Sequence, residues 1–273
     1  MLSTTNFSYL CDSVATRSAI SLGIPKRYLV IDRLTPVVKQ HKLGTLDRLV
    51  HRLRMDSKDP LWSDVIDALA TNETSFFRDE QPFGALNRKI LPRMLEASAD
   101  NSKVRIWSAA CSSGQEPFSL AMLIHEVAPR AIDRFSIHAS DVSKTMIKRA
   151  ESGTFAPLEV ARGLSESRQR RYLESCGETW RMREEIRNMI TWSQFSLADA
   201  WPTMMPFDLI LMRNVLVYFE EDAKRQVLKK TKQLLRPGGL LLLGGAEASP
   251  LAREYFSPIH VDDVTFYEAK STL

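Results

Sequence analysis

The stretch from residue 104 to residue 141 constrains the fold of this chain more than any other. It opens with V-R-I-W-S-A, an apolar run typical of a buried strand, and continues through small residues at 110–114 that indicate a turn. Residues 117–127 then carry apolar side chains at helical spacing, and a second strand pattern at 135–139 is followed by Asp141. The pattern predicts a strand–turn–helix–strand unit with a carboxylate at the tip of its second strand.

Such a unit suits a ribose-bearing cofactor, because small turn residues let the backbone approach the ligand and a carboxylate can accept both ribose hydroxyls. The pattern alone does not select the cofactor. However, the G-x-G-x-x-G spacing of dinucleotide sites is missing between Ser108 and Glu116, and the Glu116 carboxylate would repel a pyrophosphate. We therefore expect a cofactor without phosphates, and S-adenosylmethionine fits better than NAD or ATP.

The N-terminal part of the chain is helical. Four apolar stripes between residues 6 and 70, without strand signals, predict a small all-helical domain over residues 1–70. Residues 71–80 link this domain to the rest, but two adjacent aromatic residues, Phe76 and Phe77, are unusual in a plain linker. We expect the segment to contribute to the cofactor site, with pinning of a domain interface by the two Phe rings as the alternative.

Residues 81–273 alternate between strand and helix patterns. Helices are expected at 83–95, from the Ser143 cap to Ser152, within 157–174 and at 220–235, and strands at 207–212, 240–244 and within 260–267. This alternation predicts an α/β fold with a doubly wound, mostly parallel sheet. Residues 177–192 differ, because their pattern predicts a small antiparallel hairpin inserted in the domain, with Glu184-Glu185 as its turn.

Composition excludes several classes of protein. Hydrophobic residues make up 44% and charged residues 26%, an ordinary globular balance. No apolar run approaches the ~20 residues that span a bilayer, so we expect a cytoplasmic protein without membrane insertion. Three cysteines without C-x-x-C spacing argue against a disulfide framework and a zinc site, and no metal is expected.

The charge of the chain is uneven. The net charge is +4, and the segment from Lys26 to Arg54 carries eight basic residues against two acidic ones. A basic helix face is either simply solvated or a docking surface for an acidic partner, and the sequence leaves both interpretations open.

Five motifs in order resemble a known family. They are T-N-E-T-S-F-F-R at 71–78, W-S-A-A-C-S-S-G-Q-E-P-F-S at 107–119, A-S-D at 139–141, R-N-V-L-V-Y-F at 213–219 and L-L-R-P-G-G-L-L at 234–241. Together they resemble the chemotaxis receptor glutamate methyltransferases, the CheR family, over nearly the whole chain. The resemblance implies methyl transfer from S-adenosylmethionine to glutamates on the cytoplasmic helices of chemoreceptors. The products would be glutamyl methyl esters and S-adenosylhomocysteine.

The resemblance also implies which residues form the site. Arg78 and Tyr218 are expected to be catalytic, Arg78 by pairing with a carboxylate and Tyr218 by orienting the methyl group near the sulfonium. The implied cofactor-binding residues are Asn72, Thr74, Arg78, Glu116, Asp141, Ser196, Leu197, Arg213 and Asn214. The family usually has Asn in place of Ser196 and Glu in place of Gln115, so the resemblance supports backbone groups at Ser196 rather than its side chain.

The chemistry agrees with methylation of glutamate. A glutamate with a pKa of about 4.3 is already ionised at neutral pH and needs no general base, and the sequence shows no His–Asp or Cys–His constellation. A nucleic-acid methyltransferase would suit the basic charge, but the Asn/Asp-Pro-Pro-Tyr/Phe stretch of such enzymes is replaced by R-N-V-L at 213–216. A cofactor-sensing module without activity is the other alternative. We expect a monomer that binds chemoreceptor helices and no nucleic acid.

Some members of the family capture a short peptide at the receptor C-terminus by adding it as a strand to the hairpin. Their hairpin carries a longer, glycine-rich loop, whereas residues 175–179 of this chain, S-C-G-E-T, contain one glycine. The sequence therefore predicts the type that is independent of a tether peptide and docks through the methylation region and the N-terminal domain.

Overall fold

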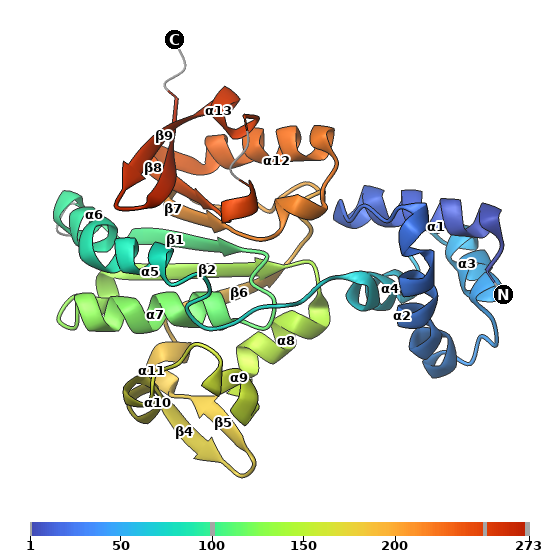
Figure 1. Ribbon diagram of the computed structural model, residues 1–273, viewed down its shortest axis with the longest axis horizontal. Helices are drawn as coiled ribbons and strands as arrows, with labels where there is room; N and C mark the ends of the chain where they lie inside the picture. Colours follow the sequence, from blue (N-terminus) through green and yellow to red (C-terminus); the bar gives the residue numbers. More distant parts are fainter. Residues whose placement is uncertain (1, 99–101, 248–249, 271–273) are drawn as a thin grey trace.

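The computed structural model describes residues 2–98, 102–247 and 250–270, which form a helical domain beside an α/β domain (Figure 1). The helical domain consists of α1 (Thr4–Ser18), α2 (Arg27–Gln40), α3 (Leu46–Met55) and α4 (Leu61–Leu69). Ser3 and Thr45 begin α1 and α3, because the hydroxyl of each accepts a backbone N–H of the first turn. Each helix buries an apolar stripe in a shared core, whose fully buried members include Leu10, Leu34, Leu49 and Val65.

A seven-stranded sheet forms the centre of the α/β domain, in the order β6-β2-β1-β7-β8-β10-β9 (Figure 1). Its strands are β1 (Val104–Ala109), β2 (Phe135–Asp141), β6 (Ile190–Gln194), β7 (Phe207–Met212), β8 (Leu235–Leu243), β9 (Phe256–Val261) and β10 (Val264–Ala269). The first five are parallel, and β9 and β10 form an antiparallel edge. The chain runs outward from β1 to β6 and returns to β7 on the other side of β1. The predicted doubly wound, mostly parallel sheet is confirmed, and its switch point lies at β1.

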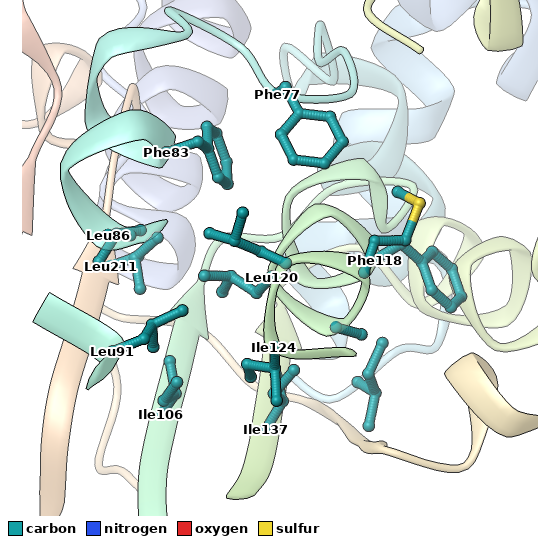
Figure 2. Close-up of a cluster of buried hydrophobic side chains, with 14 of the residues drawn as sticks. Phe77, Phe83, Leu86, Leu91, Ile106, Phe118, Leu120, Ile124, Ile137 and Leu211 are labelled. Carbon is teal, nitrogen blue, oxygen red and sulfur yellow. The ribbon is translucent and has the colours of Figure 1, made fainter. Parts of the chain in front are cut away.

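Alternate residues of the central strands face two separate cores. Ile106 and Leu211 face the first core, beside α7 (Gln115–Val127) and beneath Phe77 and Phe83 (Figure 2). Trp107 faces the second core, which α12 (Glu221–Leu234) covers. Both faces of the parallel strands are buried, which explains why their sequences are almost continuously apolar.

The helix expected at 83–95 is divided into three parts. They are α5 (Gln81–Ala85), the π-turn η2 (Leu86–Ile90) and α6 (Leu91–Ala97). Pro92 has no N–H to donate, and the N–H of Leu91 bonds to the carbonyl of Leu86 five residues earlier. The wider turn lets the helix continue past the proline toward β1.

The antiparallel insertion lies earlier in the chain than predicted. It is a three-stranded sheet of β3 (Thr154–Phe155), β5 (Thr179–Met182) and β4 (Leu173–Cys176), and it begins directly after α8 (Lys144–Ser152). Its helices α9 (Pro157–Ala161) and α10 (Glu166–Tyr172) lie within the stretch predicted as helical, although β4 takes the last two residues of that stretch. The turn between β4 and β5 is at Gly177, which has a left-handed φ of 63°.

The hairpin predicted at 177–192 is therefore wrong in its turn and in its second strand. Glu184 and Glu185 begin the short helix α11 (Glu184–Arg187), and the strand after it, β6, joins the main sheet parallel to β2. The alternation that ends in I-T-W at 190–192 was correctly interpreted as a strand, which continues to Gln194, but a period of two says nothing about the partner strand.

Candidate active site

A cavity of about 950 Å³, partly open to solvent, lies at the carboxyl ends of the parallel strands, where the α/β domain meets the helical domain. This is the place where doubly wound sheets bind ligands. Nine of the ten residues predicted for the site line the cavity: Asn72, Thr74, Arg78, Glu116, Asp141, Leu197, Arg213, Asn214 and Tyr218. Ser196 is buried outside the lining, and its hydroxyl accepts the N–H of Ala198, so its side chain serves a local turn.

Asp141 organises the turn after β1. One carboxylate oxygen accepts the N–H of Ser112 at 2.8 Å and the other accepts the N–H of Ser143 at 2.9 Å. Burial raises the pKa of the Asp141 carboxyl above its ordinary value, although these two backbone hydrogen bonds act in the opposite direction. A carboxylate has about four acceptor sites, so Asp141 holds the turn and keeps acceptor capacity toward the cavity.

The turn itself has a demanding backbone. Ala110 and Ser112 have left-handed φ values of 58° and 50°, and Gly114 has 95°. A Cβ on Gly114 would lie 2.9 Å from the Cβ of Ala150 and 3.1 Å from the Trp192 ring, so only glycine fits there. The small residues in the motif therefore allow a tight turn and close packing at the mouth of the cavity.

The guanidinium of Arg213 is buried and engaged in ion pairs and hydrogen bonds. Its guanidinium donates to Glu116 at 2.9 Å, to Asp79 at 2.9 Å and to the carbonyl of Arg78 at 2.8 Å, and its side chain is 2% exposed. Ser108 donates to the other oxygen of Glu116. Because Arg213 neutralises Glu116, the argument from sequence that Glu116 repels a pyrophosphate loses its basis.

Residues 71–80 form a strap across the site. Phe76 and Phe77 are both buried, Phe76 against the Phe155 ring of β3 and Phe77 against Phe83. The N–H of Phe77 donates to the hydroxyl of Ser119 on α7. The rings fix the strap in the core of the α/β domain and not at the interface between the domains, while Asn72, Thr74 and Arg78 reach the cavity.

Tyr218 lies on the loop that follows β7, at the end of the short helix η4 (Leu216–Tyr218). Among the described residues its hydroxyl has no hydrogen-bond partner, and its ring lines the cavity. The carbonyl of Tyr218 accepts the N–H of Ser21, which follows α1, and Ser18 and Ile20 complete that wall. The helical domain therefore closes one side of the cavity, a contribution that sequence reasoning did not foresee.

The described residues offer two further observations. None of the histidine, cysteine, aspartate and glutamate side chains among them gather in groups of three or more that could hold a metal ion. Their helices are also too short or too polar to cross a bilayer.

Sequence reasoning missed Glu247, whose carboxylate lies behind the Tyr218 loop. Its one signal is an acidic residue that closes the otherwise apolar run L-L-L-L-G-G-A-E.

Comparison with known proteins identifies the family. The family model described as "CheR methyltransferase, SAM binding domain" matches residues 72–265. This chain belongs to the CheR methyltransferase family. The matched region contains the strap, the strand ends and the loop after β7, so it covers most of the cavity lining.

Curated relatives extend the similarity beyond that region. The chain is 36% identical to "Chemotaxis protein methyltransferase Cher2" of Pseudomonas putida over 92% of this chain and 93% of that protein. It is also 36% identical to "Chemotaxis protein methyltransferase 1" of Vibrio cholerae, over 95% of both. Identity to the "Chemotaxis protein methyltransferase" of Salmonella typhimurium is 30%, over 93% of this chain and 88% of that protein. The similarity therefore includes the helical domain.

As a CheR methyltransferase, the protein is an enzyme that uses S-adenosylmethionine. The cavity suits that cofactor, because Phe195, Leu197 and Val142 offer an apolar wall while Asp141 offers a buried carboxylate. The individual contacts of Asn72, Thr74, Asp141 and Asn214 with the cofactor remain predictions.

Proposed function

We propose that the protein methylates glutamate side chains on the cytoplasmic helices of chemoreceptors, and thereby acts in chemotaxis in the cytoplasm. The observation that carries this proposal is the position of Arg78 and Tyr218. Both line the cavity near the Asp141 strand end, and both side chains are partly exposed, although Tyr218 also packs against the second core. No histidine or lysine appears among the described residues of the lining, which suits a substrate that is already ionised.

Arg78 would position a carboxylate. One guanidinium nitrogen donates to the carbonyl of Glu73 at 3.0 Å, which fixes the side chain, and its remaining N–H groups bond to no other described residue. A guanidinium can pair with a carboxylate through two parallel hydrogen bonds. The carboxylate would belong either to the substrate glutamate or to the amino-acid end of the cofactor.

The rate would come mainly from alignment. When bound, S-adenosylmethionine supplies a methyl group on a cationic sulfur. Asp141 would hold the ribose hydroxyls, and Tyr218 would limit the position of the reacting groups from the opposite wall. Alignment of reacting groups can lower a barrier by roughly 7–11 kcal/mol in favourable systems. No proton has to be removed from the substrate.

The helical domain provides a surface for the receptor. Lys39, Lys42 and Arg48 are exposed on α2, α3 and the segment between them, and their charged groups bond to no other described residue. Two other basic residues of this region serve the fold instead. Arg52 makes a two-point ion pair with Asp59, and Arg54 lies 4.4 Å from the centre of the Tyr9 ring. The docking surface is therefore carried by Lys39, Lys42 and Arg48.

We also propose that docking needs no C-terminal receptor peptide. The connection between β4 and β5 is a tight turn of two residues, Gly177 and Glu178, and is therefore shorter than the loop expected of peptide-binding members. Calorimetric titration with a receptor C-terminal pentapeptide should show no saturable binding. Micromolar binding that disappears on mutation of β4 or β5 would contradict this part of the proposal.

The reaction is tested with receptor cytoplasmic fragments and methyl-labelled cofactor. Label should enter the fragment and be released as methanol in mild base, because esters hydrolyse under conditions that leave N-methyl groups intact. Tyr218→Phe should lower the rate, while Tyr28→Phe, at a tyrosine that is 74% exposed, should not. Base-stable label, or equal labelling of a fragment whose glutamates are all replaced by glutamine, would refute glutamate methylation.

The docking surface is tested by charge reversal. The Lys39→Glu, Lys42→Glu and Arg48→Glu triple variant should slow methylation at low salt and leave binding of S-adenosylhomocysteine unchanged. At physiological salt, where charges are screened over about 8 Å, the methylation rate of the triple variant should lie closer to that of the wild type. The matched control reverses Arg93, Lys103 and Lys229, which are exposed on the α/β domain. Equal rates for both variants would show that the basic face is merely solvated.

A further inference from the structure

Glu247 occupies an unusual position behind the active-site loop. It ends the short helix η5 (Gly245–Glu247) after β8, and its side chain is buried. One carboxylate oxygen accepts the N–H groups of Val215 at 2.7 Å and Leu216 at 2.6 Å. The other accepts those of Asn214 at 2.6 Å and Gly244 at 2.8 Å. The N–H of Val217 lies 3.4 Å from the first of these oxygens, so a single carboxylate accepts five backbone N–H groups from two segments.

The sequence around Glu247 is fitted to this arrangement. Asn214 has a left-handed φ of 59°, which turns consecutive N–H groups of the loop toward one point. The first N–H groups of a helix lack partners within the helix, and Glu247 accepts these N–H groups at the start of η4. A Cβ on Gly244 would lie 2.6 Å from Glu247 and 3.0 Å from the Asn214 nitrogen, so that position requires glycine.

The loop held by Glu247 supplies one wall of the cofactor cavity. Arg213, Asn214, Val215 and Tyr218 all line it. Glu247 itself lies outside the cavity and lines a smaller depression on the other side of the loop, together with Val217 and Leu251. Its carboxylate can therefore influence the reaction through the loop backbone and not through contact with substrate or cofactor.

We propose that Glu247 is a positioning residue, which fixes residues 213–218 so that Asn214 and Tyr218 face the cofactor. This inference rests on the proposed function of Tyr218 and deepens it. Only a carboxylate meets the requirement, since each oxygen accepts at least two N–H groups. In Glu247→Gln, whichever way the amide is turned, its NH2 group faces at least two backbone donors. In Glu247→Asp the carboxylate is one methylene too short to reach both segments.

The test compares Glu247→Gln and Glu247→Asp with Asp208→Asn. Asp208 is also a partly buried carboxylate of the sheet, but it binds Arg236 and the N–H of Arg105 at the opposite end of β7. Measurements are the Tm, the affinity for S-adenosylhomocysteine by calorimetry, and kcat and KM for methylation of a receptor fragment. All rates are taken well below the lowest Tm.

Glu247→Gln is expected to lower kcat by about 100-fold, the effect of displacing reacting groups by about 1 Å, with KM for the fragment little changed. Affinity for S-adenosylhomocysteine should fall by about tenfold, the equivalent of one lost hydrogen bond to a charged or polar group. Asp208→Asn should lower the Tm and leave both readouts unchanged. A folded Glu247→Gln protein with kcat and affinity within about twofold of the wild type would overturn the proposal.

The two proposals can fail separately. If the wild type does not methylate the fragment, the proposed function fails, and the affinity for S-adenosylhomocysteine still decides whether Glu247 positions the loop. If the wild type is active and the Glu247 variants have a lower Tm but unchanged kcat and affinity, the positioning role fails while glutamate methylation stands.

Discussion

Arg213→Met tests the ion pair that joins the strap, α7 and β7. The substitution keeps an apolar stem of similar length and removes the charge, so it leaves Glu116 with the Ser108 hydroxyl as its partner. The side chains of Arg213 and Glu116 are 2% and 14% exposed, so water cannot replace the guanidinium freely. Loss of one partner from a buried pair costs about 3–5 kcal/mol of unfolding free energy, because the other charge stays buried without compensation.

The loss of unfolding free energy should be measurable by both thermal and urea unfolding. At about 2–4 °C per kcal/mol for a domain of this size, the Tm should fall by roughly 6–20 °C. Asp79 adds little to this estimate, since its side chain is 56% exposed. Urea unfolding followed by tryptophan fluorescence gives the free energy directly, because Trp107 is buried in the same sheet.

Two further variants make the result decisive. Arg225→Met removes a surface guanidinium that binds Glu221 and Glu254, and it should change the unfolding free energy much less. The double variant Arg213→Met with Glu116→Gln removes both charges and should recover part of the loss. An Arg213→Met variant that loses less than about 1 kcal/mol of unfolding free energy, or a double variant that is no more stable than Arg213→Met, would refute the buried-pair reasoning.

Two further predictions concern groups in the cavity. Because burial raises the pKa of Asp141, affinity for S-adenosylhomocysteine should fall on acidification at a pH above the ordinary aspartate pKa. Calorimetry of Asp141→Asn should show weak binding that does not depend on pH in this way. An unchanged affinity in the folded variant would exclude Asp141 from the site. Burial raises the pKa of Cys111 well above the ordinary thiol value, so iodoacetamide at neutral pH should modify the exposed Cys176 and spare Cys111, as mass spectrometry of tryptic peptides would show. Rapid labelling of Cys111 in the folded protein would contradict its burial.

Features that depend on neighbouring residues in sequence were predictable. The unit from β1 to β2 follows from local apolar patterning, and β7 was placed at its observed residues because buried parallel strands are short apolar runs. The cavity residues were assigned through the resemblance of their motifs to the CheR family, and the parallel topology brings those motifs to one edge of the sheet. The positions of most strands therefore needed no long-range information, whereas most residues of the site were assigned by the family resemblance.

Features that depend on distant partners were not predictable. The strand at 190–194 has the same alternation whether it pairs in a hairpin or at the edge of a parallel sheet, so its partner β2 was missed. The ion pairs of Arg213 join residues 97 and 134 positions apart, and no periodicity reports such a contact. Glu247 was missed for the same reason, since its role exists only where the ends of β7 and β8 meet.

The helical domain closes the cavity with Ser18 and Ile20 and also carries the basic face of Lys39, Lys42 and Arg48. Arg33 of α2 bonds to the carbonyls of Leu69 and Ala70, at the point where the strap begins. A receptor bound to this domain would thus act on the same rigid body that borders the cofactor. By thermodynamic linkage, any factor by which the receptor tightens the cofactor is the factor by which the cofactor tightens the receptor. The enzyme with bound cofactor and the empty enzyme would then differ in affinity for a receptor by that factor.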